Sequence, residues 1–299
     1  MQKKILCVNY HFTRKCNFKC GFCFHTQKNT EKLPIDQAIE GLKKLKEYGM
    51  RKINFAGGEP FTEPKYLGEL IKICKEQLKI EKISIITNGS LVKKKFFEDF
   101  GKYIDVFGVS CDSFIPETNI KIGRGEKGNN VKKLFELREW CKDYNIKFKL
   151  NTVVCNLNKD ENMVENIQKL KPDRWKCFQV LMVKGENEDS TKLRDVTKFL
   201  ISDEEFNNFI ERHKKIECLV KESNKVMKSS YLILDEKMRF LDKGDGEEFM
   251  SESILDVEVE KVLEKIKYDQ EEFYKRGGDY LFDNKIKTEC NKMNKLLEF

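Results

Sequence analysis

Apolar residues follow two different spacings in turn along the first 181 positions of the chain. Short strand-like runs cover residues 4–13, 52–56, 83–87, 105–112, 147–154 and 174–181. Between them, apolar residues recur at helical spacing in segments 34–48, 66–79, 92–100, 131–144 and 161–170. Alternating strands and helices are typical of a parallel sheet with right-handed crossovers. Six strands are fewer than the eight of a closed barrel, so the pattern predicts an α/β fold, a partial (βα)6 barrel open on one side.

The pattern loosens after residue 185. Helices are expected at 203–215 and 258–265, a strand at 230–235 and a flexible Gly- and acid-rich loop at 242–252. We found no internal repeat and no low-complexity linker. We therefore expect a barrel core at 1–185 and a C-terminal extension at 186–299 that completes and covers the functional site.

Polar motifs follow several of the predicted strands directly. They are the cysteine loop at 12–24, G-G-E-P at 57–60, T-N-G-S at 87–90 and S-C-D-S at 110–113. In parallel α/β folds, functional residues gather at the carboxyl ends of the strands. The four motifs therefore predict one shared active site.

Charge and composition narrow the class of protein. The chain has 57 basic and 50 acidic residues, a net charge of +7 spread along the sequence without a basic block. This distribution favours solvated lysine-rich helices over a nucleic-acid surface, although a modest excess of positive charge also suits a polyphosphate ligand. Neither a signal peptide, nor an amphipathic N-terminal helix, nor an apolar run of roughly 18 residues is evident, so no membrane partner is expected.

Cysteine usage points to a metal site rather than to disulfides. Eleven cysteines, an odd number with three clustered, do not form a disulfide pattern and indicate a reducing, cytoplasmic location. The cluster consists of Cys16, Cys20 and Cys23. Crowded thiolates suit a soft metal or an iron–sulfur cluster. Three protein ligands leave a coordination position open for chemistry, whereas a structural zinc site normally has four. Zinc remains an alternative on the cysteines alone.

The C-x3-C-x2-C loop, with Phe22 before its last cysteine, resembles the cluster loop of radical S-adenosylmethionine enzymes, and G-G-E-P matches a further motif of that family. The resemblance implies a [4Fe–4S] cluster on the three cysteines, with S-adenosylmethionine on the fourth iron. Cleavage of the sulfonium then yields a 5′-deoxyadenosyl radical. The residues implied to contact S-adenosylmethionine are Phe22, Gly57, Gly58, Glu59, Pro60, Asn88, Ser110 and Arg124. Asn88 and its neighbour Ser90 are equally consistent with shaping a turn.

Further motifs resemble one branch of that family, the viperin-like enzymes. They include N-Y-H-F-T-R-K-C-N-F-K-C-G-F-C-F-H-T, I-G-R-G, S-N-K-V-M-K-S-S-Y-L-I-L-D-E-K-M-R-F-L, S-I-L-D-V and K-R-G-G-D-Y, and the match runs from about residue 4 to 282. Animal members carry an amphipathic N-terminal helix, so the chain is similar to a fungal or prokaryotic relative, or to a trimmed form. The resemblance implies antiviral defence by dehydration of a pyrimidine nucleoside triphosphate to its 3′-deoxy-3′,4′-didehydro analogue. CTP is the expected substrate and UTP the alternative.

The same resemblance assigns residues to the substrate. Those implied to bind it are Asn9, Lys52, Lys149, Asn151, Lys176 and Arg276, and Tyr231 is implied to return a hydrogen to the product radical. Lys149 and Lys176 interrupt apolar strands and are therefore expected to point into the barrel. A further basic residue of the family is missing, because residues 247–252 are acidic here; Lys243 is a candidate replacement.

Two other classes of function stay open from the sequence. A radical S-adenosylmethionine enzyme acting on a peptide, RNA or small metabolite is one, although Cys218 and Cys290 do not form the additional cysteine cluster usual in peptide-modifying members. A non-enzymatic zinc-binding module is the other. For the enzyme, we expect a flavodoxin- or ferredoxin-type electron donor, a monomer, and His25 beside the cluster rather than on it.

Overall fold

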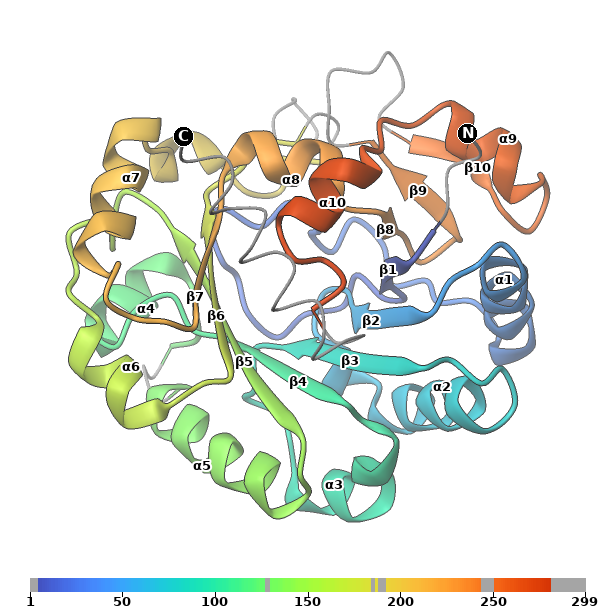
Figure 1. Ribbon diagram of the computed structural model, residues 1–299, viewed down its shortest axis with the longest axis horizontal. Coiled ribbons are helices and arrows are strands. Elements are labelled where there is room, and N and C mark those ends of the chain that lie inside the picture. The colour runs from blue at the N-terminus through green and yellow to red at the C-terminus, as the bar shows by residue number, and fades with distance from the viewer. Residues whose placement is uncertain (1–4, 127–129, 184–185, 188–191, 243–249, 281–299) are drawn as a thin grey trace, which may run out of the picture.

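The fold is built on one curved, largely parallel sheet (Figure 1). The computed structural model describes residues 5–126, 130–183, 186–187, 192–242 and 250–280. The strands expected from the sequence are all present and pair in parallel in chain order, which confirms the predicted core. They are β1 (Cys7–His11), β2 (Lys52–Ala56), β3 (Lys82–Thr87), β4 (Val106–Ser110), β5 (Lys147–Val154) and β6 (Arg174–Gln179).

The sheet has ten strands, in the order β10-β9-β8-β1-β2-β3-β4-β5-β6-β7, so the prediction of six was incomplete. All the additional strands come from residues after 185. β7 (Leu219–Glu222) extends the sheet beyond β6, and β8 (Ile233–Leu234) pairs with β1 in parallel. β9 (Arg239–Leu241) and β10 (Met250–Ser253) continue from β8 in antiparallel pairing. The C-terminal residues thus extend both edges of the core sheet, and the proposed division at residue 185 stays a prediction.

Most of the helices lie on the outer face of the sheet (Figure 1). Their bounds are α1 Ile35–Glu47, α2 Pro64–Glu76, α3 Lys94–Phe100, α4 Pro116–Ile122, α5 Asn130–Asp143, α6 Val164–Leu170, α7 Asp203–Arg212, α8 Asn224–Ser230, α9 Val259–Glu264 and α10 Gln270–Lys275. Single 3-10 turns cover Pro60–Thr62, Gly101–Tyr103 and Val196–Phe199. The seven-residue α4 was not predicted, because it is too short and polar for a helical period to show. α8 and α10 lie between β7 and β8, across the interior of the curved sheet (Figure 1).

Alternation along the strands separates the apolar core from an inner cavity. On β5, Phe148, Leu150 and Val154 are fully buried and belong to the main hydrophobic core. Lys149 and Asn151 point the other way and line the cavity inside the barrel. Because successive side chains of a strand face opposite sides, a basic residue within an apolar strand faces inward here.

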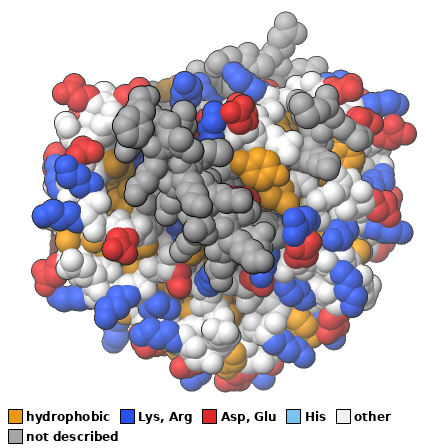
Figure 2. All heavy atoms as spheres, viewed as in Figure 1, with side chains coloured by type: hydrophobic (Ala, Val, Ile, Leu, Met, Phe, Trp, Pro, Cys, Tyr) orange, Lys and Arg blue, Asp and Glu red, His pale blue; other side chains and the backbone are white. Residues whose placement is uncertain are grey.

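The described surface is mixed in charge. On the face drawn in Figure 2, lysine and arginine side chains are interspersed with acidic ones rather than gathered in a single field. None of the helices in the described ranges combines the length and apolar character needed to cross a bilayer.

Candidate active site

A cavity of about 350 Å³ lies inside the barrel. This volume is within the range of small-molecule binding sites. The cavity brings together most of the residues singled out from the sequence. Those that line it are Asn9, Cys16, Cys20, Phe22, Cys23, Lys52, Gly57, Gly58, Asn88, Ser110, Arg124, Lys149, Asn151, Lys176, Tyr231 and Arg276.

The three clustered cysteines lie at one end of this cavity, and none of them is in a disulfide. Burial raises the pKa of the Cys16 thiol to about 11 and that of Cys23 to about 12. A bound metal is what would hold such thiols as thiolates at neutral pH. In the described part of the chain, no three Cys, His, Asp or Glu side chains are grouped as ligands of a single metal ion. Three unpaired thiols that border one cavity fit a cluster that offers a separate iron to each.

Backbone contacts on two sides hold the cysteine loop. On one side, the amide of Gly58 donates to the Thr13 carbonyl at 2.7 Å, and the amide of Glu59 donates to that of Lys15 at 2.6 Å. A Cβ at Gly58 would lie 2.1 Å from the Lys15 oxygen, so only glycine permits this approach. The glycines of G-G-E-P therefore permit the close approach of two backbone segments, and their predicted contact with S-adenosylmethionine stays a prediction.

The I-G-R-G segment holds the other side of the loop. The amide of Lys19 donates to the Gly123 carbonyl at 3.1 Å, and that of Gly21 donates to Ile122 at 2.9 Å. Gly123 has φ +93°, and a Cβ there would lie 2.3 Å from the Lys19 oxygen. G-G-E-P and I-G-R-G, which are distant in sequence, therefore fix the same loop from opposite sides.

Glu59 and Pro60 do not line the cavity, although both were expected to contact S-adenosylmethionine. The Glu59 side chain is 0% exposed. It accepts hydrogen bonds from the Thr87 hydroxyl (2.6 Å), the Asn88 amide (2.7 Å) and the Phe61 amide (3.0 Å). Burial raises the pKa of this carboxyl. In this arrangement the carboxylate links the loop after β2 to the end of β3, and its predicted contact with the cofactor stays a prediction.

Two side chains beside the cysteines have partners from neighbouring loops. The side-chain nitrogen of Asn88 donates to the side-chain oxygen of Asn17 at 2.9 Å, which joins the end of β3 to the cysteine loop. The Arg124 Nε donates to Asp112 at 2.5 Å, and its guanidinium carbon lies 5.8 Å from the centre of the Phe22 ring. Asp112 in turn accepts from the Val153 amide at 2.9 Å. Arg124 is thus oriented toward the cavity by a buried carboxylate.

Cations gather at the opposite end of the cavity, at the amino-terminal halves of the strands. Strand register places Lys52 beside Cys7, Lys149 beside Arg174, and Asn151 beside Lys176. Lys52 and Gly57 are five residues apart on and just after β2, which corresponds to about 16 Å of extended chain. An elongated ligand can therefore reach from the cysteines to the cations.

Burial favours the neutral form of two of these lysines. Burial, together with the neighbouring charges of Lys52 and Arg174, lowers the pKa of Lys149 to about 7. Burial likewise lowers the pKa of Lys52. A polyanion entering the cavity would restore the preference for the charged form.

Tyr231 lies among these cations. Its phenol oxygen accepts from the Lys176 Nζ at 2.8 Å, and its ring lies under the Arg276 guanidinium at 3.8 Å from ring centre to Cζ. Lys176 is ion-paired with buried Glu222, which lies 3.7 Å from the Arg276 Nη1 and also hydrogen-bonds Tyr231. Burial raises the pKa of the Tyr231 phenol far above its usual value, so the O–H proton is retained.

Arg174 and Asn54 line the cavity but were missed in the sequence. The Arg174 guanidinium donates to the backbone oxygens of Gly277 and Arg276, both at 3.0 Å, and lies 4.6 Å from the Tyr280 ring. Arg174 is two residues from Lys176 on one strand face, so the rule that identified Lys176 would have found it. The Asn54 amide donates to the Asn9 side chain at 2.8 Å. Lys243, residues 247–249 and Cys290 lie outside the described residues.

Comparisons with known proteins agree with this geometry. The model of the radical SAM superfamily matches residues 10–170. The S-adenosylmethionine-dependent nucleotide dehydratase RSAD2 of Oncorhynchus mykiss is 50% identical over 278 residues, which cover 92% of this chain and 80% of the relative. The chain belongs to the radical SAM nucleotide dehydratase family. The dehydratase of Lacinutrix mariniflava is 39% identical over 287 residues, 93% of this chain and 59% of that relative.

A solved structure shares the fold of this family member. SuiB of Streptococcus suis, solved with bound S-adenosylmethionine, has a TM-score of 0.65 at 19% identity and covers 92% of this chain and 68% of its own. The family match and the 50% identical relative confirm the resemblance noted from the motifs, and with it an enzymatic function of the radical S-adenosylmethionine type. A non-enzymatic zinc module is not consistent with membership of the family.

Proposed function

We propose that this chain dehydrates a pyrimidine nucleoside triphosphate, with CTP favoured over UTP, to its 3′-deoxy-3′,4′-didehydro analogue. One observation carries the proposal: a single cavity has three cysteines at one end and Lys52, Lys149, Lys176 and Arg276 at the other. Guanidinium and ammonium groups are the usual ligands of phosphate oxygens. Relatives named as nucleotide dehydratases, at up to 50% identity, support the same conclusion.

The cysteines would hold a [4Fe–4S] cluster, with S-adenosylmethionine bound beside Gly57, Gly58, Ser110 and Arg124. When bound, this pair supplies the radical that removes a hydrogen atom from the substrate. The protein contributes position. The cations fix the triphosphate, and with it the ribose, so that its C4′–H bond points toward the cysteine end.

Tyr231 is proposed to complete the reaction. After C4′ loses its hydrogen atom, departure of the 3′-hydroxyl as water requires one proton, and closure of the C3′–C4′ double bond requires one electron. The phenol of Tyr231, protonated and hydrogen-bonded to Lys176 and Glu222, can donate both. An external one-electron donor, of the flavodoxin or ferredoxin type, and a proton from solvent would then restore the tyrosine.

The remaining assignments follow from the same proposal. Asn9 and Asn151 line the middle of the cavity and are proposed to contact the nucleoside. A 3′-deoxy product would end a growing nucleic acid chain when a polymerase incorporates it, which supports a role in antiviral defence. We further propose that the enzyme is a cytoplasmic monomer.

The test is to incubate the anaerobically reconstituted, reduced enzyme with S-adenosylmethionine and each of CTP, UTP, GTP and ATP. We expect one pyrimidine nucleotide to raise 5′-deoxyadenosine formation most, with a product lighter than the substrate by one water. If no nucleotide raised 5′-deoxyadenosine formation, the proposed function would be wrong.

A further inference from the structure

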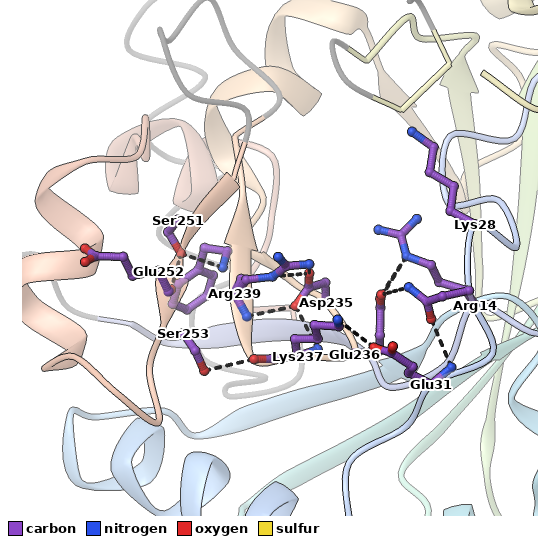
Figure 3. A network of polar contacts seen from close by, with 12 residues as sticks. Arg14, Lys28, Glu31, Asp235, Glu236, Lys237, Arg239, Ser251, Glu252 and Ser253 are labelled. Carbon is purple, nitrogen blue, oxygen red and sulfur yellow. Dashed lines mark hydrogen bonds and ion pairs between the residues drawn. The ribbon is translucent and has the colours of Figure 1, made fainter. Parts of the chain in front are cut away.

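A buried ion cluster includes Arg14 of the cysteine loop (Figure 3) and does not line the cavity described above. Its centre is Arg14, two positions before Cys16 and 2% exposed. The Arg14 Nε donates to both carboxylate oxygens of Glu236, at 2.8 and 3.0 Å. Its two terminal nitrogens donate to the oxygens of Glu186, at 3.0 and 2.8 Å. One planar guanidinium therefore binds two buried carboxylates at once.

The cluster joins three distant parts of the chain. Arg14 lies in the cysteine loop, Glu186 follows β6, and Glu236 follows β8; the two pairs are 172 and 222 residues apart in sequence. Glu236 is five residues after Tyr231, the residue proposed to act on the substrate. Arg14 therefore connects the metal-binding loop directly to the segment that carries Tyr231.

The segment that follows the cysteine loop is attached to the same ion cluster. The Asn29 side chain donates to Glu236 at 2.8 Å, and the Arg14 Nη1 donates to the Thr26 carbonyl at 3.3 Å. Residues on both sides of the three cysteines are thus fixed to Glu236. The Lys28 Nζ lies 3.9 Å from Glu186 and adds positive charge at the partly exposed side (Figure 3).

The turn that presents Glu236 is itself held by polar contacts (Figure 3). Asp235 accepts from the Arg239 guanidinium at 2.7 and 2.9 Å and from the Lys237 and Arg239 amides, both at 2.9 Å. The Ser253 hydroxyl donates to the Lys237 carbonyl at 2.9 Å, which joins the turn to β10. Glu236 therefore projects from a turn that is hydrogen-bonded both within itself and to β10.

Stability alone does not explain this cluster. A buried set of ions loses much of its attraction to desolvation, and well-packed apolar side chains are often as stable. What a planar, five-donor guanidinium adds is a fixed mutual geometry of its partners. An arginine between two carboxylates from distant segments therefore sets a distance and an angle between those segments.

We propose that Arg14 is a positioning residue that sets the Tyr231 segment at its working distance from the cysteine loop. The inference rests on the proposed function. That function requires the nucleotide and Tyr231 to be held at a fixed distance from the cysteine end of the cavity. Radical formation needs the cysteine loop and the S-adenosylmethionine site, whereas its use on the nucleotide also needs the Tyr231 segment. Loosening the ion cluster should therefore lower nucleotide dehydration more than it lowers the formation of 5′-deoxyadenosine.

The test compares R14K and E236Q with the wild-type chain. R14K keeps the positive charge but loses the planar guanidinium that binds both carboxylates. E236Q keeps the shape of the side chain but loses its negative charge. E31Q is the matched control, because Glu31 pairs at 2.6 Å with Lys237 of the same turn while 60% exposed at its side chain. Three quantities are measured: iron per chain, 5′-deoxyadenosine formed without nucleotide, and dehydrated nucleotide per 5′-deoxyadenosine with nucleotide present.

We expect R14K and E236Q to bind iron and to form 5′-deoxyadenosine without nucleotide at near wild-type levels. Their ratio of dehydrated nucleotide to 5′-deoxyadenosine should fall at least fivefold, and E31Q should keep the wild-type ratio. An unchanged ratio in both R14K and E236Q would overturn the inference. If R14K binds too little iron to assay, the test relies on E236Q, which leaves Arg14 in place. An unchanged ratio of dehydrated nucleotide to 5′-deoxyadenosine in E236Q would then overturn the inference.

Amide hydrogen exchange tests the positioning without any substrate, so it separates this inference from the proposed function. Residues 231–241 should exchange faster in R14K and E236Q than in the wild-type chain and E31Q. Unchanged exchange in this segment would overturn the inference even if the enzyme dehydrates nucleotides. Faster exchange would support it even if the substrate proved to be of another class.

Discussion

The ammonium nitrogen of Lys176 lies 2.8 Å from the phenol oxygen of Tyr231 and donates a hydrogen bond to it. Lys176 lies on β6 and Tyr231 directly follows α8, 55 positions later in the sequence. Lys176 is therefore oriented by a phenol as well as by Glu222, and the phenol is held by the group proposed to bind phosphate. The proposed phosphate ligand and the proposed hydrogen donor are thus in direct contact.

Replacing Tyr231 with phenylalanine should separate radical formation from turnover. Y231F keeps the ring under the Arg276 guanidinium but loses the O–H that would donate a proton and an electron. We expect dehydrated nucleotide to fall by roughly 10²-fold, the scale of a lost proton-transfer group. Formation of 5′-deoxyadenosine should fall far less. Both products are measured by liquid chromatography with mass detection in single-turnover reactions.

A matched control for Y231F is Y280F, which also changes a cavity-lining tyrosine near Arg174. Y280F should retain most of the dehydration. If Y231F formed product at the wild-type rate, the assignment of Tyr231 as hydrogen donor would be wrong.

The pH dependence of substrate affinity should follow the protonation of Lys149. Its pKa is lowered to about 7 by burial and by nearby Lys52 and Arg174, so above pH 7 the free protein increasingly holds neutral lysine. A triphosphate favours the charged form, so binding at alkaline pH must take up a proton. The dissociation constant should therefore rise about tenfold per pH unit above 7 and level off below it.

Calorimetry in two buffers of different ionisation enthalpy at pH 8 would count the protons taken up. K149R is the matching variant, because its guanidinium stays charged throughout this range. K149R should lose the part of the pH dependence and of the proton uptake that comes from this position, so its pH slope should be shallower than that of the wild-type chain. The same pH slope in K149R and wild type would exclude Lys149 as the titrating group.

The sequence allowed the fold and much of the cavity to be predicted for physical reasons that particular residues illustrate. Lys149 and Lys176 interrupt apolar strands, and a strand alternates its faces, so both had to point inward. Arg174 obeys the same rule but was overlooked. Glu222 offered no such signal, because β7 (L-V-K-E) is short and half-buried. The pairing of Arg14 with Glu236 was beyond sequence reasoning, since nothing local to either residue specifies a partner 222 positions away.

Arg174 should contribute to substrate affinity through the turn after α10. Its two terminal nitrogens each donate at 3.0 Å to carbonyls at positions 276 and 277, which holds the backbone that carries Arg276. R174K keeps the charge but cannot make both bonds, a loss on the order of 2 kcal/mol. The KM for nucleotide should therefore rise ~30-fold, with kcat less affected.

A suitable control is R138K on α5, because Arg138 also donates to two backbone carbonyls, of Leu170 and Lys171, away from the cavity. Steady-state kinetics on both variants would decide. An unchanged KM in R174K, or an equal rise in R138K, would contradict the role given to Arg174.

The contact between Gly58 and the cysteine loop should be essential for cluster binding. In G58A the new Cβ would lie 2.1 Å from the Lys15 carbonyl oxygen and 2.5 Å from its carbon, both backbone atoms that cannot rotate away. The loop must shift, and Cys16 follows Lys15 directly. We expect G58A to fold but to bind less than half of the wild-type iron after reconstitution. G41A is the control, because its Cβ would meet only the flexible end of Met238, so iron should be retained. Full iron binding in G58A, measured beside circular dichroism of the same samples, would show that the loop tolerates the displacement and that the close approach at Gly58 is not required.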